Sequence, residues 1–214
     1  MQPALTLYHF PGACSRVTVC ALGMAGLDYE LKLINLAKEE QTGEAYKAIS
    51  PLGKVPLMLV DGVPLAENAA LLTFIGALRP ESGVFPGGHE PLARAEAIGG
   101  LSFCGGTLHP QIRGMANPQR VTVGDGEPVR AKSRGLLMKS FGYAESRLAE
   151  RGWWLGERSI VDVYLDWAFD VARRSGFDTS PFPQLDALRT RLVELPAYVR
   201  MTEIDAQSRV TLGL

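Results

Sequence analysis

Over the first part of the chain, the spacing of hydrophobic residues changes back and forth between that of a β-strand and that of an α-helix. Residues 5–10 (LTLYHF) are rich in β-formers and stop at a Pro-Gly pair, which predicts a strand and then a turn. From Ser15 to Gly26, apolar residues recur at three- and four-residue spacing, which predicts a helix. Residues 29–36 alternate again and predict a second strand.

The pattern then predicts a short helix, a hairpin and a longer helix. Residues 39–50 predict a short polar helix, and residues 67–78 predict a largely apolar one. Between them, Asp61-Gly62 divides two short apolar runs, which is a strong β-hairpin signal. The order β-α-β-α-β-β-α within about 80 residues is typical of an α/β domain in which helices cover a four-stranded sheet.

Helical spacing dominates the chain after a Pro- and Gly-rich segment at residues 80–91. Residues 159–172 are apolar on nearly every face, as expected of a helix in the centre of a bundle. Residues 182–192 and 196–206 predict two shorter helices, whereas residues 114–130 break the pattern and predict a loop near a functional site. One apolar stripe predicts a further helix: Leu137, Phe141, Ala144 and Leu148.

These patterns predict two domains of different class. We expect an α/β domain over residues 1–80, a linker over residues 81–90, and an all-α helical bundle over residues 91–214. A chain of 214 residues is long enough to give these domains a packed core.

Composition narrows the function classes. Apolar residues make up 46% of the chain, charged residues 21%, and the net charge is -1, which is typical of a globular protein without a nucleic-acid partner. The apolar runs are too short to span a membrane, and the N-terminus lacks a basic segment followed by an apolar stretch. We therefore expect a cytoplasmic protein without a membrane partner.

The cysteines favour a reduced protein. Cys14, Cys20 and Cys104 are odd in number and lack the spacing of metal ligands. We expect no metal site and no structural disulfide, with Cys20 in a structural position.

Cys14 and Ser15 stand side by side where the first predicted helix begins. Unpaired N–H groups and the helix dipole stabilise an anion there, so a thiol ionises more readily than free cysteine, whose pKa is about 8.5. In one interpretation Cys14 is an activated thiol, or both residues donate hydrogen bonds to a thiolate that a ligand brings. In the other, Ser15 caps the helix and Cys14 is a small buried residue.

Two further junctions place polar groups beside turns. Lys54-Val55-Pro56 precedes an apolar strand, and Pro56 forces Val55 into an extended conformation. The segment either starts the strand or leaves the Val55 backbone to a peptide-like ligand. Glu67-Asn68 opens an apolar helix, where the pair either complements the helix dipole or holds an amino-acid zwitterion, with Glu67 on the ammonium group.

Five other polar residues receive simpler interpretations. Ser159 and Asp162 have the spacing of a capping box, which predicts a structural role. His109 is the one histidine in a mostly apolar helical setting, and it is either structural or a general acid or base. His9 and His89 lie at a predicted strand end and in a predicted loop.

The order of these motifs resembles that of cytosolic glutathione transferases over about residues 4–205. PGACS at a helix start is followed by Lys-Val-Pro, Asp-Gly and Glu-Asn, and then by a helical half with Ser-x-x-Asp. PGACS, GTLHP and WWLGERSIVDVYL look most like the bacterial beta class. The resemblance implies a thioredoxin-like N-terminal domain, a helical-bundle C-terminal domain, a homodimer, and glutathione as cosubstrate.

The resemblance also implies site residues. Cys14 matches the beta-class cysteine that touches the glutathione sulfur, and Ser15 matches the serine that other classes use. His109 matches a histidine that faces the site from the helical domain. Val55 would pair with the cysteinyl amide of glutathione through its backbone, and Pro56 matches the cis-proline of the family. Glu67 would bind the γ-glutamyl group of glutathione. The full set implied for glutathione binding is Val55, Pro56, Glu67, Asn68, Lys38 and Lys54.

We therefore expect a glutathione S-transferase that stabilises the glutathione thiolate for attack on a small apolar electrophile. Alternatives that use the same thiolate are aryl-ether cleavage, isomerisation and thiol-disulfide exchange. An alternative of another class is a non-catalytic binding protein with the glutathione transferase fold.

Overall fold

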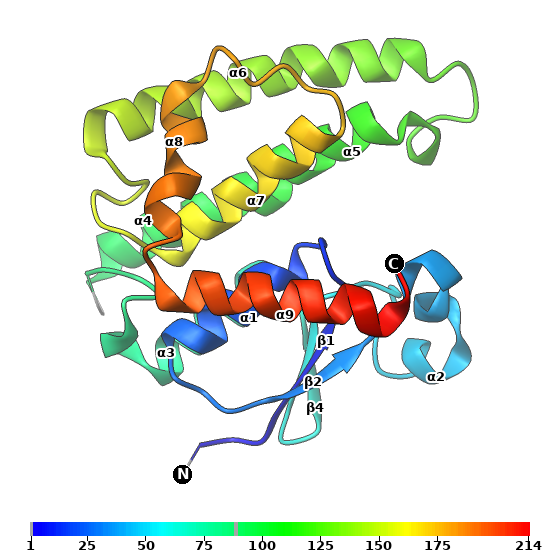
Figure 1. Cartoon of the computed structure of the whole chain (residues 1–214), viewed down its shortest axis with the longest axis vertical. Coiled ribbons are helices and arrows are strands. Elements are labelled where there is room, and N and C mark those ends of the chain that lie inside the picture. Colours follow the sequence, from blue (N-terminus) through cyan, green and yellow to red (C-terminus); the bar gives the residue numbers. More distant parts are fainter. Residues whose placement is uncertain (1, 88–89) are drawn as a thin grey trace. The chain divides into compact units, whose positions relative to one another are not determined.

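The computed structural model describes residues 2–87 and 90–214, and the chain divides into two compact units (Figure 1). One unit contains the chain up to Val84 together with Glu194–Leu214, and the other contains Phe85–Val193. Gly88 and His89, in the expected linker, lie outside the described residues. The expected division assigned residues 194–214 to the helical half, whereas here they join the first unit.

A four-stranded sheet in the order β2-β1-β3-β4 forms the centre of the first unit. Its strands are β1 (Leu5–His9), β2 (Glu30–Leu33), β3 (Leu57–Val60) and β4 (Val63–Ala66). β1 runs parallel to β2 and antiparallel to β3. Val60 pairs with Val63 across Asp61-Gly62, whose φ angles of 49° and 83° are those of a type I′ turn. The predicted sheet and hairpin are confirmed.

The helices of the first unit are α1 (Ser15–Met24), α2 (Glu44–Lys47), α3 (Asn68–Leu78) and α9 (Pro196–Leu212), and a 3-10 turn at Pro80–Ser82 follows α3. Helices α1 and α3 were predicted correctly. The single helix predicted at residues 39–50 is wrong, because two 3-10 turns, Leu36–Lys38 and Glu40–Thr42, precede the short α2. Gly43 has an extended backbone (φ -66°, ψ 149°), which interrupts the helical hydrogen bonds.

Different helices cover the two faces of the sheet. Alternate residues of β1 are buried, and the last of them contacts Ser15 of α1 and Asp205 of α9: Leu5, Leu7 and His9. Tyr8 points to the opposite face, where its ring meets the ring of Tyr46 in α2 edge-on, with centroids 5.4 Å apart. The face that carries His9 therefore also carries the start of α1.

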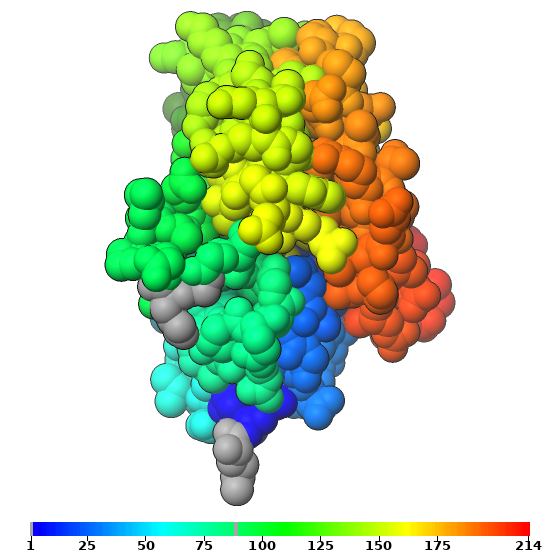
Figure 2. All heavy atoms as spheres, turned by 90° about the vertical axis from the view of Figure 1, so that its left-hand side faces the viewer, coloured from blue at the N-terminus to red at the C-terminus, as the bar shows by residue number. Residues whose placement is uncertain are grey.

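Helix α9 packs along α1, and both views place its orange-to-red segment beside the blue of α1 (Figures 1 and 2). It continues to Leu212, beyond its predicted end at residue 206. Its buried positions recur at helical spacing but include two polar residues: Tyr198, Met201, Asp205 and Ser208. The prediction ended too early because this stripe contains no apolar residue after Met201.

The second unit is helical over its described residues, as predicted. Its helices are α4 (Pro91–Ser102), α5 (His109–Ala116), α6 (Glu127–Arg151), α7 (Ile160–Arg174) and α8 (Pro183–Leu192). The predicted apolar stripe of α6 is at most 1% exposed: Leu137, Phe141, Ala144 and Leu148. Helix α7 is buried on nearly every face over its first ten residues, which confirms its predicted central position.

Helix α7 begins with the predicted capping box. The Ser159 hydroxyl accepts a hydrogen bond from the Val161 N–H at 3.2 Å. The Asp162 carboxylate accepts from the backbone N–H groups of Ser159 and Trp154, each at 2.8 Å. Burial raises the pKa of the Asp162 carboxyl, and these donors oppose the shift. The structural interpretation of the pair is confirmed.

The loop predicted at residues 114–130 is shorter than expected. Helix α5 continues to Ala116, a 3-10 turn covers Pro118–Arg120, and α6 already begins at Glu127. Pro128 lies in the first turn of α6, where a missing N–H costs no helical hydrogen bond. Across residues 2–87 and 90–214, no helix is both long enough and apolar enough to cross a membrane.

Candidate functional site

The start of α1 is the centre of the candidate site. A turn with Gly12 at a positive φ of 80° leads to Cys14, which occupies the N-cap of α1. The Cys14 thiol lies 3.7 Å from the carbonyl oxygen of Val55, and its side chain is largely buried. The Cys14 carbonyl accepts a hydrogen bond from the Asn68 side-chain amide at 2.9 Å. Cys14 thus joins three segments that are distant in the sequence.

Ser15 points into the protein. Its side chain is fully buried, and its hydroxyl oxygen lies 2.8 Å from Nδ1 of His9. The same oxygen lies 3.3 Å from both the backbone N and the carbonyl oxygen of Phe10. The Ser15 hydroxyl therefore links the start of α1 to the end of β1 through hydrogen bonds.

His9 is a neutral, buried imidazole at neutral pH. Burial lowers its pKa from 6.5 to about 4, while the Asp205 carboxylate pulls in the opposite direction and Arg16 lowers the pKa further. Its Nε2 atom lies 3.6 Å from Oδ1 of Asp205 in α9. The sequence predicted only that His9 ends a strand, so its link to the last helix is a new finding.

Asp205 connects α9 to the turn before Cys14. Its Oδ1 accepts the Gly12 backbone N–H at 2.8 Å, and its Oδ2 lies 3.8 Å from the Arg209 guanidinium. Sequence reasoning missed Asp205 because it lies 193 residues from Gly12. A signal existed: Asp205 is a lone acidic residue on the otherwise uncharged buried stripe of α9.

The Val55–Pro56 peptide bond is cis, as the resemblance implied. Val55 is half-buried and precedes β3, which begins at Leu57. The backbone of Lys54 is fixed from one side, because its carbonyl accepts from the Tyr46 hydroxyl at 2.8 Å. The Lys54 side chain itself is exposed.

Glu67 and Asn68 form the start of α3 and differ in their surroundings. Glu67 is exposed and has a positive φ of 71°. Asn68 is buried, and its Oδ1 accepts the Thr18 hydroxyl at 2.7 Å while its Nδ2 donates to Cys14. Asn68 therefore ties the starts of α1 and α3 together. Lys38, the last predicted binding residue of this unit, is exposed in a 3-10 turn.

His109 lies in the second unit, at the start of α5. A π-helical segment, Phe103–Leu108, precedes it and was not predicted. The His109 ring meets Trp167 of α7 edge-on at 4.7 Å, and its Nε2 accepts from Arg113 Nε at 3.3 Å. The ring orientation is thus held by two neighbours.

The three cysteines form no disulfide bond within the described residues. Cys20 and Cys104 are fully buried. Burial raises the pKa of the Cys104 thiol well above its ordinary value, which keeps that thiol unreactive.

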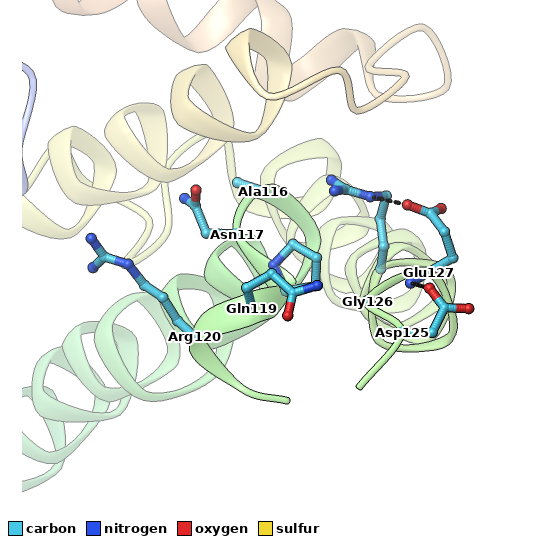
Figure 3. Close-up of a pocket in the computed structure, with 9 residues that line it drawn as sticks. Ala116, Asn117, Gln119, Arg120, Asp125, Gly126 and Glu127 are labelled. Carbon is cyan, nitrogen blue, oxygen red and sulfur yellow. Dashed lines mark hydrogen bonds and ion pairs between the residues drawn. The ribbon is translucent and has the colours of Figure 1, made fainter. Parts of the chain in front are cut away.

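A pocket of about 530 Å³ lies at the connection between α5 and α6 (Figure 3). Its lining comes from residues 116–120, 125–127 and 130, so it shares no residue with the predicted site. Arg130 pairs with Glu127 at 3.0 Å, and Asp125 accepts the Glu127 backbone N–H at 3.0 Å (Figure 3). These groups stabilise the start of α6.

Comparisons with known proteins agree with this arrangement. A family model described as "Glutathione S-transferase, N-terminal domain" matches residues 3–77. Glutathione S-transferase GST-4.5 of Xanthomonas campestris pv. campestris is 29% identical over 196 residues, which cover 88% of this chain and 93% of the relative. Maleylacetoacetate isomerase of Pseudomonas aeruginosa is 28% identical over 199 residues, which cover 91% of this chain and 92% of the relative.

Solved structures extend the likeness to nearly the whole chain. A glutathione transferase homologue from Sulfitobacter with bound glutathione has a TM-score of 0.84 and 26% identity, covering 94% of this chain and 97% of that one. A bacterial beta class glutathione S-transferase of Sphingomonas chungbukensis has a TM-score of 0.82 and 26% identity, covering 94% and 98%. With its thioredoxin-like sheet, cis-Pro56 and helical second unit, the chain has the glutathione S-transferase fold, and its residues 3–77 match the N-terminal domain of that family.

Proposed function

We propose that this protein is a glutathione S-transferase that binds glutathione on its first unit, with the glutathione sulfur at the start of α1. The observation that carries the proposal is the meeting of three segments at Cys14. Its thiol faces the Val55 carbonyl at 3.7 Å, and its own carbonyl binds Asn68 at the start of α3. The Pro-Gly turn, the segment before cis-Pro56 and the start of α3 are therefore neighbours.

Each part of glutathione has a matching group in this proposal. The backbone of Val55 pairs with the cysteinyl residue of glutathione, beside the exposed cation of Lys54. The exposed Glu67 carboxylate takes the γ-glutamyl ammonium group. The exposed Lys38 ammonium takes the glycine carboxylate. Asn68 contributes by fixing the start of α3, where backbone N–H groups donate hydrogen bonds to the γ-glutamyl carboxylate.

The start of α1 supplies the chemistry. The positive end of the α1 dipole and the Cys14 thiol stabilise the glutathione thiolate, because the Arg16 and Val17 N–H groups already donate to the carbonyls of Ala13 and Cys14. The thiolate attacks an electrophilic carbon, a C–S bond forms, and the leaving group departs with its electron pair. A conjugation of this kind needs no oxidant or reductant.

Cys14, rather than Ser15, is the proposed contact to the sulfur. The Ser15 hydroxyl is fully buried and hydrogen-bonds with the end of β1. Cys14 lies at the helix cap beside Val55, which is the position that a bound peptide thiol would share. His109, whose ring Trp167 and Arg113 orient, is proposed as a general acid or base.

A glutathione-dependent isomerase is the second candidate function, favoured by the 28% identity to a maleylacetoacetate isomerase. The same thiolate would add to one carbon of a cis double bond, the resulting single bond would rotate, and elimination would return the thiolate. Glutathione is regenerated in that reaction, whereas conjugation consumes it.

Turnover assays with three substrates separate these functions: a halonitroarene, a cis-alkene diacid and a glutathione mixed disulfide. We expect glutathione conjugation of the halonitroarene, with kcat/KM reduced about tenfold in Cys14→Ala because one hydrogen-bond donor to the thiolate is lost. Ser15→Ala should mainly lower the free energy of unfolding, by about 1–3 kcal/mol.

Three outcomes would contradict the transferase proposal. Isomerised diacid without conjugate would favour the isomerase. Loss of disulfide exchange alone in Cys14→Ala would reassign that thiol. A parent protein that turns over none of the substrates and shows no thermal shift with millimolar glutathione would be the non-catalytic alternative.

A further inference from the structure

We propose that Asp205, together with His9, positions the Gly12–Cys14 turn for glutathione, so that the last helix of the chain sets the geometry of the sulfur site. The inference rests on the proposed function. Neither residue touches the expected ligand; both act through the turn that carries Cys14.

The first observation is the hydrogen bond between Asp205 and Gly12. The Asp205 carboxylate is buried, with 6% of the residue exposed, and its Oδ1 accepts the Gly12 N–H at 2.8 Å. A hydrogen bond to an ionised acceptor is roughly twice as strong as a neutral one. Gly12 has a φ of 80°, so this contact holds the turn at its most unusual backbone position.

The second observation is the alignment of His9 between Asp205 and Ser15. Oδ1 of Asp205 lies 3.6 Å from Nε2 of His9, and Nδ1 of His9 lies 2.8 Å from the Ser15 hydroxyl. A neutral imidazole has one N–H and one acceptor nitrogen. The Ser15 oxygen also donates to the Phe10 carbonyl at 3.3 Å, so Ser15 links His9 to the end of β1.

This alignment has a consequence for the residue before Ser15. The Ser15 hydroxyl bonds with His9 and with Phe10, inside the unit. Asp205 fixes the turn on one side of Cys14, and His9 fixes the helix start on the other. Cys14 lies between these two fixed segments, and its thiol lies beside Val55. Pre-organisation of this kind matters because a displacement of about 1 Å costs up to roughly a hundredfold in rate.

Asp205→Ala and Asp205→Asn, compared with the exposed control Glu203→Gln on the same helix, test the inference in the full chain. The measurements are kcat/KM with glutathione and a halonitroarene, the thiol pKa of bound glutathione, and hydrogen exchange of the backbone amides of residues 12–15. We expect Asp205→Ala to lower kcat/KM about tenfold, to raise the bound thiol pKa and to speed exchange in that segment. Asp205→Asn keeps a neutral acceptor for the Gly12 N–H, so its changes should be smaller, and Glu203→Gln should match the parent.

A folded Asp205→Ala with parental thiol pKa, turnover and exchange would overturn the inference and leave the proposed function intact. If Asp205→Ala does not fold, a folded Asp205→Asn with the parental thiol pKa and turnover would overturn it equally. If the parent itself binds no glutathione, the proposed function fails, and the positioning role fails with it.

Discussion

At the scale of single residues, the Cys14-Ser15 pair shows how adjacent side chains divide their roles. The sequence predicted the place of the pair at a helix start but left open which residue faces a ligand. The structure buries the Ser15 hydroxyl against His9, whereas the Cys14 thiol lies beside Val55. The sequence could not decide this, because the contacts of Ser15 arise from the fold: its hydroxyl meets His9, which lies beside Asp205 of α9.

The buried imidazole of His9 predicts how stability depends on pH. In the unfolded chain the His9 imidazole takes up a proton near pH 6.5, but in the folded chain it does so only near pH 4. The unfolded state therefore binds more protons between these two pH values. The contribution of His9 to stability is complete above pH 6.5 and is lost as the pH falls toward 4, by roughly 3 kcal/mol.

Denaturant unfolding at several pH values between 7 and 4 measures this loss. His9→Asn keeps an acceptor for Ser15 and does not titrate, so its stability should fall less steeply than that of the parent. Equal slopes for parent and variant would show that His9 does not contribute to the acid sensitivity.

At the scale of elements, hydrophobic period and capping chemistry predicted most of the fold. The β1-α1 unit, the Asp61-Gly62 hairpin and the Ser159–Asp162 capping box are all governed by interactions within a few residues. Two helical segments were predicted wrongly because the sequence pattern does not distinguish them from ordinary helices. Gly43 divides the helix expected at residues 39–50, and the π-helical segment at Phe103–Leu108 retains the apolar spacing of an ordinary helix.

The capping box of α7 predicts a large stability effect without an effect on chemistry. Asp162→Ala leaves the buried N–H groups of Ser159 and Trp154 without their acceptor, so we expect the free energy of unfolding to fall by about 2–4 kcal/mol. Chemical denaturation measures it. The exposed Glu157→Ala is the matched control and should change stability by less than about 0.5 kcal/mol. A fall of similar size in both variants would refute the structural role of Asp162.

At the scale of the whole molecule, the motifs in their order predicted the superfamily that the full-length likeness supports. The sequence predicted Cys14, Val55 and the start of α3 because these residues adjoin turns and helix ends, whereas the cis bond before Pro56 was implied only by the family resemblance. It did not predict that α9 joins the first unit, because the buried stripe of α9 includes Asp205 and Ser208. The identity of the electrophile and the expected homodimer remain predictions.

The most direct test of the proposed function is a titration of the glutathione thiol in the complex, followed by its ultraviolet thiolate absorbance. We expect the bound thiol to have a pKa at least about one unit below the value near 8.5 of a free cysteine thiol, with part of that shift lost in Cys14→Ala. A bound thiol that titrates like free glutathione in the parent protein would contradict a thiolate-stabilising site at the start of α1.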